Sequence, residues 1–267
     1  MEPSTELSPR LRFAVSIARE AGDHTLKYFR STDLQVDRKG DESPVTVADR
    51  EAELLLRKRI AAQFPDDAIL GEEFPEKPGT SGYRWILDPI DGTKSFIHGV
   101  PLYGTMVGVE HDQKSIVGVV YIPALNEIVY AGRGEGCWYQ FQDQPVQRAA
   151  VSKVKTLSEA LFVTSEVKTY QRRPCGTDAY TRLQDACRLS RTWGDCYGYL
   201  LVATGRAELM VDPIMNVWDA AAIQPILEEA GGTFTNWKGE ETIHSGEGIG
   251  TNGSVLDEVL NLTSGDA

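Results

Sequence analysis

The chain has 267 residues and a formal net charge of −12, from 39 acidic and 27 basic side chains. Hydrophobic residues make up 41% of it, which is enough for a packed interior and argues against a disordered chain. The negative charge argues against nucleic acid or an anionic membrane as the partner, so we expect neither. If such an acidic protein binds an anionic substrate, a site loaded with divalent cations would explain how.

The cysteines and the N-terminus indicate a cytoplasmic protein. The four cysteines, at positions 137, 175, 187 and 196, form no C-x-x-C pair, so reduced thiols are favoured over a zinc or disulfide framework. The first residues lack the apolar stretch of a signal peptide, and no run approaches the roughly 20 apolar residues of a membrane span.

The first half of the chain predicts two helices followed by an antiparallel sheet. Ser8-Pro9 is typical of a helix start, and apolar residues at helical spacing continue to about Phe29. A polar, glycine-containing loop is expected over 37–43, and a second helix, capped by a threonine, over 46–64. Strands are expected at 68–70, 83–87, 105–109, 116–121 and 127–131, the last three as an antiparallel meander.

The second half alternates strands and helices. Strands are expected at 160–164 and 208–211, helices at 179–188, 197–204 and 217–230, and a helix C-cap at the glycine pair 231–232. We therefore divide the chain near residue 150. An N-terminal part of helices and antiparallel sheet would span 1–150, and a C-terminal α/β part would span 151–267, both packed tightly as one unit.

Three acidic groups lie at the ends of apolar segments. Glu72 and Glu73 follow a short strand, Asp88 and Asp91 follow another in the string DPIDGT, and Asp219 opens a helix. Alone, each group has an ordinary explanation: a solvated turn, a turn with an Asx cap, or a helix-start acid beside a core tryptophan. All three together indicate a metal site.

The DPIDGT string can bring its oxygens to one point. Pro89 holds Asp88 extended, so that Asp88 and Asp91 can converge and the Ile90 carbonyl can face the same point. Gly92 removes a side chain where a ligand must approach the backbone. Gathered carboxylates repel one another, and a hard divalent cation removes that repulsion. Oxygen-only ligands select Mg²⁺, Mn²⁺ or Ca²⁺, and no EF-hand pattern is present.

The motifs GEE (71–73), DPIDGT (88–93), WDAAA (218–222) and EAGG (229–232) are similar to those of the inositol monophosphatase family of Mg²⁺-dependent, lithium-sensitive phosphatases. The resemblance covers nearly the whole chain. It implies a layered αβαβα sandwich of mixed α+β and α/β character, and often a homodimer. It also implies hydrolysis of a small-molecule phosphate monoester by attack of a metal-activated water.

The resemblance implies two or three Mg²⁺ ions in each active site, which Mn²⁺ could replace. The ligands implied are Glu72, Asp88 and the Ile90 carbonyl for the first ion, Asp88, Asp91 and Asp219 for the second, and Glu73 for a weaker third.

Other matching positions imply roles in catalysis and in phosphate binding. Thr93 and Asp49 match the pair that orients the attacking water, and Glu73 counts with them among the catalytic residues. The N–H groups of Gly92 and Thr93 would hold phosphate oxygens. Lys39 resembles a lysine that closes over the site, and a solvated loop lysine is an equal alternative.

The stretches 88–101 and 194–213 look most like the histidinol-phosphate phosphatase branch of the family. Asp195 and Asp212 match positions beyond the phosphate, where two carboxylates suit the ammonium and imidazole of L-histidinol phosphate. Alternatively, Asp195 caps the helix that begins near Tyr197, and Asp212 caps a strand end before Pro213.

We therefore expect a phosphatase that converts L-histidinol phosphate to L-histidinol, a step of histidine biosynthesis. An inositol-1-monophosphatase, or another sugar or nucleotide phosphatase of the family, stays open as an alternative. A divalent-metal-binding module without enzymatic activity is disfavoured, because the catalytic positions are filled as well as the ligand positions.

Overall fold

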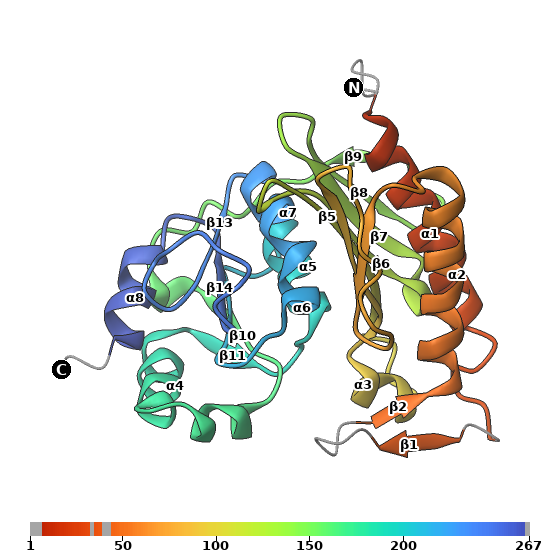
Figure 1. Cartoon of the computed structure of the whole chain (residues 1–267). Helices are drawn as coiled ribbons and strands as arrows, with labels where there is room; N and C mark the ends of the chain where they lie inside the picture. The colour runs from red at the N-terminus through yellow and green to blue at the C-terminus, as the bar shows by residue number, and fades with distance from the viewer. Residues whose placement is uncertain (1–6, 33–34, 39–43, 265–267) are drawn as a thin grey trace.

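The computed structural model describes residues 7–32, 35–38 and 44–264 (Figure 1). The chain begins with two helices, α1 (Pro9–Thr25) and α2 (Val47–Gln63), each with a hydroxyl cap. The Ser8 hydroxyl accepts a hydrogen bond from the N–H of Leu11, and the predicted cap of α2 is confirmed as a capping box. The prediction that α1 continues to Phe29 was wrong, because the helix ends at Thr25 and Leu26 is 39% exposed. Phe29 packs on Phe96 and Tyr103 from the turns that follow.

Two short strands connect these helices. β1 (Val36–Arg38) and β2 (Pro44–Thr46) form an antiparallel pair, in which Asp37 faces Val45. The expected polar loop over 37–43 is therefore wrong at its first two residues, which are strand, and residues 39–43 lie outside the described part of the chain.

A seven-stranded sheet follows, and it confirms the predicted meander. In spatial order its strands are β3 (Ala68–Gly71), β4 (Tyr83–Asp91), β5 (Gly104–His111), β6 (Lys114–Ile122), β7 (Glu127–Gly132), β8 (Gly136–Phe141) and β9 (Gln147–Arg148). All neighbours are antiparallel except β3 and β4, which are parallel. β4 runs past the expected end at Leu87 to Asp91, with a shift of register after Asp88.

The second half of the chain forms a mixed five-stranded sheet. In spatial order its strands are β11 (Leu189–Arg191), β10 (Leu161–Val163), β12 (Leu209–Asp212), β14 (Gly248–Thr251) and β13 (Thr233–Thr235). β10 is parallel to both of its neighbours, whereas β14 is antiparallel to both of its own. The carboxyl ends of β10 and β12 therefore lie at the same edge.

The remaining helices complete five alternating layers. They are α3 (Thr93–Ile97), α4 (Gly176–Ala186), α5 (Cys196–Ala203), α6 (Val217–Ala221), α7 (Ile223–Glu229) and α8 (Leu256–Thr263), with 3₁₀ segments at Pro123–Leu125, Leu157–Glu159 and Val167–Arg172. α1 and α2 cover the outer face of the large sheet, α5–α7 lie between the sheets, and α4 and α8 cover the small sheet (Figure 1). This arrangement is the expected αβαβα sandwich.

Three large apolar cores fill the spaces between these layers, and a fourth, small one surrounds Phe96 and Tyr103. One joins α1 and α2 to the large sheet, the second packs α5 and α7 against both sheets, and the third joins α4 and α8 to the small sheet. Within the described residues, no helix has both the length and the apolar character to cross a membrane.

The single helix expected over 217–230 is broken into α6 and α7 at Ala222. Pro225 has no N–H to donate to the carbonyl of Ala221, one helical turn earlier. The hydroxyl of Ser115, on β6, donates to that carbonyl instead, at 2.5 Å. The C-cap predicted at the end of α7 is confirmed, because Gly231 has a φ of +88°.

Candidate active site

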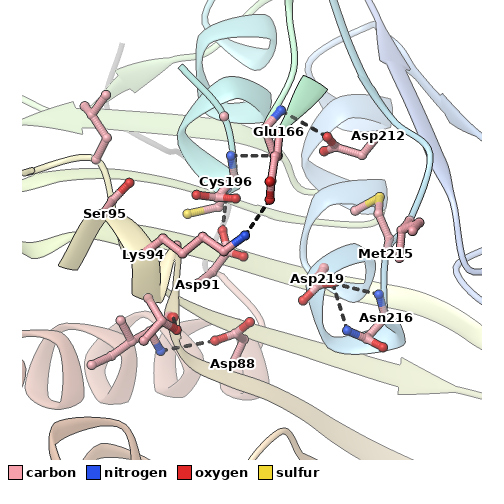
Figure 2. Close-up of a pocket in the computed structure, with 18 of the residues that line it drawn as sticks. Asp88, Asp91, Lys94, Ser95, Glu166, Cys196, Asp212, Met215, Asn216 and Asp219 are labelled. Carbon is pink, nitrogen blue, oxygen red and sulfur yellow. Dashed lines mark hydrogen bonds and ion pairs between the residues drawn. The ribbon is translucent and has the colours of Figure 1, made fainter. Parts of the chain in front are cut away.

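A cavity of about 500 Å³ lies where strand ends from both sheets meet. Its lining comes from the end of β4, the residues after β10, the end of β12, and the first turns of α5 and α6 (Figure 2). The expected site residues that line it are Glu72, Asp88, Ile90, Asp91, Gly92, Thr93, Asp195, Asp212 and Asp219. Asp49 and Glu73 are outside this lining, and Lys39 lies outside the described residues.

The end of β4 brings two carboxylates into the cavity. Asp88 is 2% exposed, and its Oδ1 accepts a hydrogen bond from the N–H of Ile90 at 3.1 Å. The carbonyl of Pro89 accepts from the Thr105 hydroxyl at 2.8 Å, which holds the irregular part of the strand in place. The shift of register between the two aspartates lets Asp91 follow Asp88 into the same space.

A tight turn follows, and its geometry requires glycine. Gly92 has a φ of +83°, and a Cβ there would lie 2.9 Å from Asp195 Oδ2. The hydroxyl of Thr93 donates to the Ile90 carbonyl at 3.1 Å. This bond holds the Thr93 side chain within the turn that follows Asp91.

Asp49 lies on α2, where it takes part in the cap. Its Oδ2 accepts from both the N–H and the hydroxyl of Thr46, at 2.8 Å and 2.6 Å. Among the described residues, its Oδ1 is buried and has no hydrogen-bond partner. A buried carboxylate oxygen without a partner is costly, so this atom is suited to a proton, a water or a cation.

The third carboxylate comes from the C-terminal half. Asp219 is in the first turn of α6, where its Oδ2 accepts from the N–H of Asn216 at 2.7 Å. Close packing holds this turn against the large sheet, since a Cβ on Gly108 would lie 2.8 Å from that of Ala221. Asp88, Asp91 and Asp219 each offer an oxygen, and these oxygens lie within 4.8 Å of one another (Figure 2).

The negative charges of this cluster repel one another. The pKa of Asp88 is raised well above its ordinary value, first by burial and then by the charges of Glu72 and Asp91. Burial likewise raises the pKa of Asp219 to about 7 and that of Asp49 to about 6. These carboxyls need either protons or a cation to be stable together.

The cavity has little positive charge of its own. Lys94 is the one basic side chain among the described residues that line it. Its amino group lies 2.5 Å from Glu166 Oε2 and is therefore already paired (Figure 2). Oxygen donors alone, crowded and mutually repelling, fit a hard divalent cation.

The loop after β3 supplies the remaining acidic groups. Glu72 lines the cavity, and its N–H donates to the carbonyl of Leu87 at 3.2 Å, one residue before Asp88. The N–H of Glu73 instead donates to Glu53 Oε2, at 2.7 Å. The two neighbouring glutamates thus have different surroundings.

The opposite wall is built by the C-terminal half. Asp195 occupies the N-cap position of α5 without a side-chain cap bond, and its N–H donates to the Ser165 hydroxyl at 3.0 Å. Asp212 ends β12, and its carboxylate accepts from the N–H of Ser165 and the hydroxyl of Tyr199, both at 3.1 Å. Burial raises the pKa of Asp212 to about 6.

Ser165, Glu166 and Lys94 are among the cavity residues that sequence analysis missed. Ser165 and Glu166 come shortly after the carboxyl end of β10, as Glu72 follows β3, and this placement could have drawn attention to them. Lys94 follows Thr93 in the DPIDGT string, but nothing in the sequence shows that it meets Glu166, 72 residues away.

Comparisons with known proteins agree on one family. The family model described as the inositol monophosphatase family matches residues 6–265. The histidinol-phosphatase of Chlorobaculum parvum is 47% identical over 91% of this chain and 92% of its own length. The histidinol-phosphatase of Mycobacterium tuberculosis is 37% identical over 94% and 96%. The crystal structure of the extragenic suppressor protein SuhB of Bartonella henselae has a TM-score of 0.87, at 26% identity, over 97% of this chain and 100% of its own.

Proposed function

The chain belongs to the inositol monophosphatase family, and from that premise we propose that it hydrolyses L-histidinol phosphate to L-histidinol and phosphate with Mg²⁺. It is a phosphoric monoester hydrolase that acts on a small-molecule phosphate ester. The observation that carries the proposal is the convergence of Asp88, Asp91 and Asp219 at the end of a cavity with one basic lining residue among those described.

In the proposed mechanism the chain holds two or three metal ions. Their ligands would be Glu72, Asp88, Asp91, Asp219 and the Ile90 carbonyl, with Glu73 at a weaker third position. Mg²⁺ bound there supplies Lewis acidity, which lowers the pKa of a water and offsets the negative charge of the phosphate. Mn²⁺ shares the preference for oxygen ligands and would replace it.

The chain's own groups position the reactants. Thr93 and Asp49 orient the attacking water, and the partnerless Asp49 Oδ1 is the atom that would accept its proton. The N–H groups of Gly92 and Thr93 would hold the phosphate oxygens in line for attack. Lys39 would close over the bound phosphate.

The substrate preference rests on relatives and on charge. Two relatives named as histidinol-phosphatases are 47% and 37% identical over nearly the whole chain. L-histidinol phosphate carries an ammonium and an imidazole, and Asp195 and Asp212 line the cavity beyond the three converging carboxylates. A hydrogen bond with an ionised partner contributes about 1.5–3 kcal/mol, and an ammonium also neutralises the charge of the carboxylate, which an inositol hydroxyl cannot do.

The test is phosphate release from a panel of L-histidinol phosphate, inositol 1-phosphate, fructose 1,6-bisphosphate, 3′-phosphoadenosine 5′-phosphate and an aryl phosphate. We expect the highest kcat/KM on L-histidinol phosphate and no activity in excess chelator. Faster hydrolysis of inositol 1-phosphate would move the chain to the inositol branch. Full activity in chelator would overturn the metal mechanism.

Three further properties belong to the same proposal. We expect inhibition by millimolar lithium, a homodimer in solution and a cytoplasmic location. Assays with added LiCl, analytical ultracentrifugation and cell fractionation check them in turn.

A further inference from the structure

Glu53 is a buried carboxylate beneath the acidic loop that follows β3. It lies on α2 one turn after Asp49, and it is fully buried. Its Oε1 accepts from Arg57 Nε and its Oε2 from the N–H of Glu73, both at 2.7 Å. A buried ion pair is seldom a net gain in stability, so this one invites a second explanation.

The backbone of the loop packs directly on this pair. A Cβ on Gly71 would lie 2.2 Å from Glu53 Oε1, so the loop can approach the carboxylate only with glycine at that position. On the other side, Arg57 Nη2 donates to the carbonyl of Phe74 at 2.8 Å. Glu53 and Arg57 thus contact the backbone both before and after Glu72.

Glu72 is therefore held between two fixed points. Its N–H is fixed as well, by the carbonyl of Leu87 on β4. The backbone from which its side chain enters the cavity is consequently fixed.

We propose that Glu53 and Arg57 form a positioning pair, which sets the Glu72 carboxylate against Asp88 so that the two can share a divalent cation. The inference rests on the proposed function, because it takes Glu72 to be a metal ligand. Neither member of the pair lines the cavity. Their effect passes through the backbone of residues 71–74.

Glu53→Gln is the sharpest substitution. The glutamine has nearly the same volume, but its side chain has one acceptor oxygen and one NH₂ donor. The NH₂ group would face either Arg57 Nε or the N–H of Glu73, both of which are donors, so one of these two hydrogen bonds must be lost. We expect the affinity for Mn²⁺, measured by calorimetry on the metal-free full chain, to fall roughly 10- to 100-fold. The kcat at saturating metal should stay near the wild-type value, because no reacting group has changed.

Two further variants extend the test. Arg57→Met should weaken metal binding in the same direction, and it carries the test by itself if Glu53→Gln does not fold. The double variant Glu53→Gln/Arg57→Met removes the clash of donors, so the amide oxygen can again accept from the N–H of Glu73. We expect the double variant to bind Mn²⁺ more tightly than Glu53→Gln.

Two controls separate positioning from general stability. Arg59, on α2 like Glu53, forms an exposed ion pair with Glu20 of α1, which Arg59→Ala removes. Ile17→Ala opens a cavity in the apolar core between α1, α2 and the large sheet, without a change in the loop. Both should leave Mn²⁺ affinity unchanged. If Glu53→Gln and Arg57→Met lose only stability, as Ile17→Ala does, the positioning role is overturned and the proposed function stands. A wild type that binds no divalent ion would overturn both.

Discussion

Among single residues of the cavity, Asp195 has the least ordinary backbone. Its φ of 51° and ψ of −152° lie in a region that is essentially reserved for glycine. Residues held there cost about 1–3 kcal/mol each and cluster at functional sites. The side chain gains no helix-cap bond in return, which removes the alternative explanation that Asp195 is there to cap α5.

Two substitutions at Asp195 separate strain from charge. Asp195→Gly should raise the free energy of unfolding by about 1 kcal/mol, because glycine adopts this conformation readily. Asp195→Asn keeps the strain and should not gain that stability. Both should raise KM for L-histidinol phosphate far more than KM for an aryl phosphate, because only the former brings an ammonium.

The measurements are steady-state kinetics on the two substrates and urea unfolding of the metal-free protein. Equal KM changes on both substrates would contradict the role in recognition. A lower free energy of unfolding for Asp195→Gly than for the wild type would contradict the proposal that the backbone of Asp195 is strained.

Among the elements, the joint between α6 and α7 depends on one hydroxyl. Ser115→Ala leaves the buried carbonyl of Ala221 without its donor, which should cost about 1–3 kcal/mol of stability. Because Asp219 lies two residues before Ala221, we also expect a higher Mg²⁺ requirement. Thermal unfolding and a Mg²⁺ titration of activity measure the two effects.

Ser158→Ala is the matched control, since this hydroxyl is exposed. A Ser115→Ala protein that is as stable as this control would show that the joint does not need the bond.

Many helices and strands could be predicted from the sequence, where the signals that define them are local. Apolar runs located the meander, and hydroxyl residues located the starts of the first two helices. The break at Ala222 was missed although Pro225 is a local signal for it. The compensating donor could not be predicted, because Ser115 lies 106 residues away. β14 was missed because two of its four residues are glycines, which disfavour strands.

Some residues of the candidate site could likewise be predicted from the sequence, and others could not. Asp88 and Asp91 could be named from the DPIDGT string and Asp219 from its place at a helix start, and the structure brings the three together. The Glu53–Arg57 pair beneath the acidic loop could not be named, because its contact with Glu73 depends on how α2 packs against β3.

Across the whole molecule, the two halves share one core. Side chains of both sheets pack on α5 and α7, and Glu229 of α7 accepts from the N–H groups of Gly134 and Gly136 at 2.8 Å each. We therefore propose that the parts 1–150 and 151–267 unfold together. Urea unfolding followed by circular dichroism and by tryptophan fluorescence should give one coincident transition. Two separated transitions would show independent halves.

The acidic cluster should also make the metal-free protein sensitive to pH. Folding raises the pKa of Asp49 and Asp212 to about 6 and that of Asp219 to about 7. Such groups stabilise the fold fully below their unfolded pKa of about 4, and this stability is lost as pH rises through the folded values. In chelator, we expect the free energy of unfolding to fall by on the order of a few kcal/mol between pH 5 and pH 8.

Added Mg²⁺ should restore stability at pH 8, where the carboxylates are charged. Asp88→Asn removes one repelling charge, so the metal-free variant should be more stable than the wild type at pH 8 and more than about 100-fold less active with metal. Urea unfolding in chelator and in Mg²⁺ at the two pH values measures this. A free energy of unfolding in chelator that does not change between pH 5 and pH 8 would contradict the proposed repulsion among these carboxylates.

The cavity takes its acidic floor and its opposite wall largely from different stretches of chain. Both sets line the cavity. Under the proposed function, the residues at 88–93 would bear the chemistry that any phosphate ester requires, whereas 165–169 and 192–195 would contact the alcohol part of the substrate. Exchange of segments 165–169 and 192–195 between relatives should therefore transfer substrate selectivity. The same scaffold could then hydrolyse phosphate esters of different alcohols.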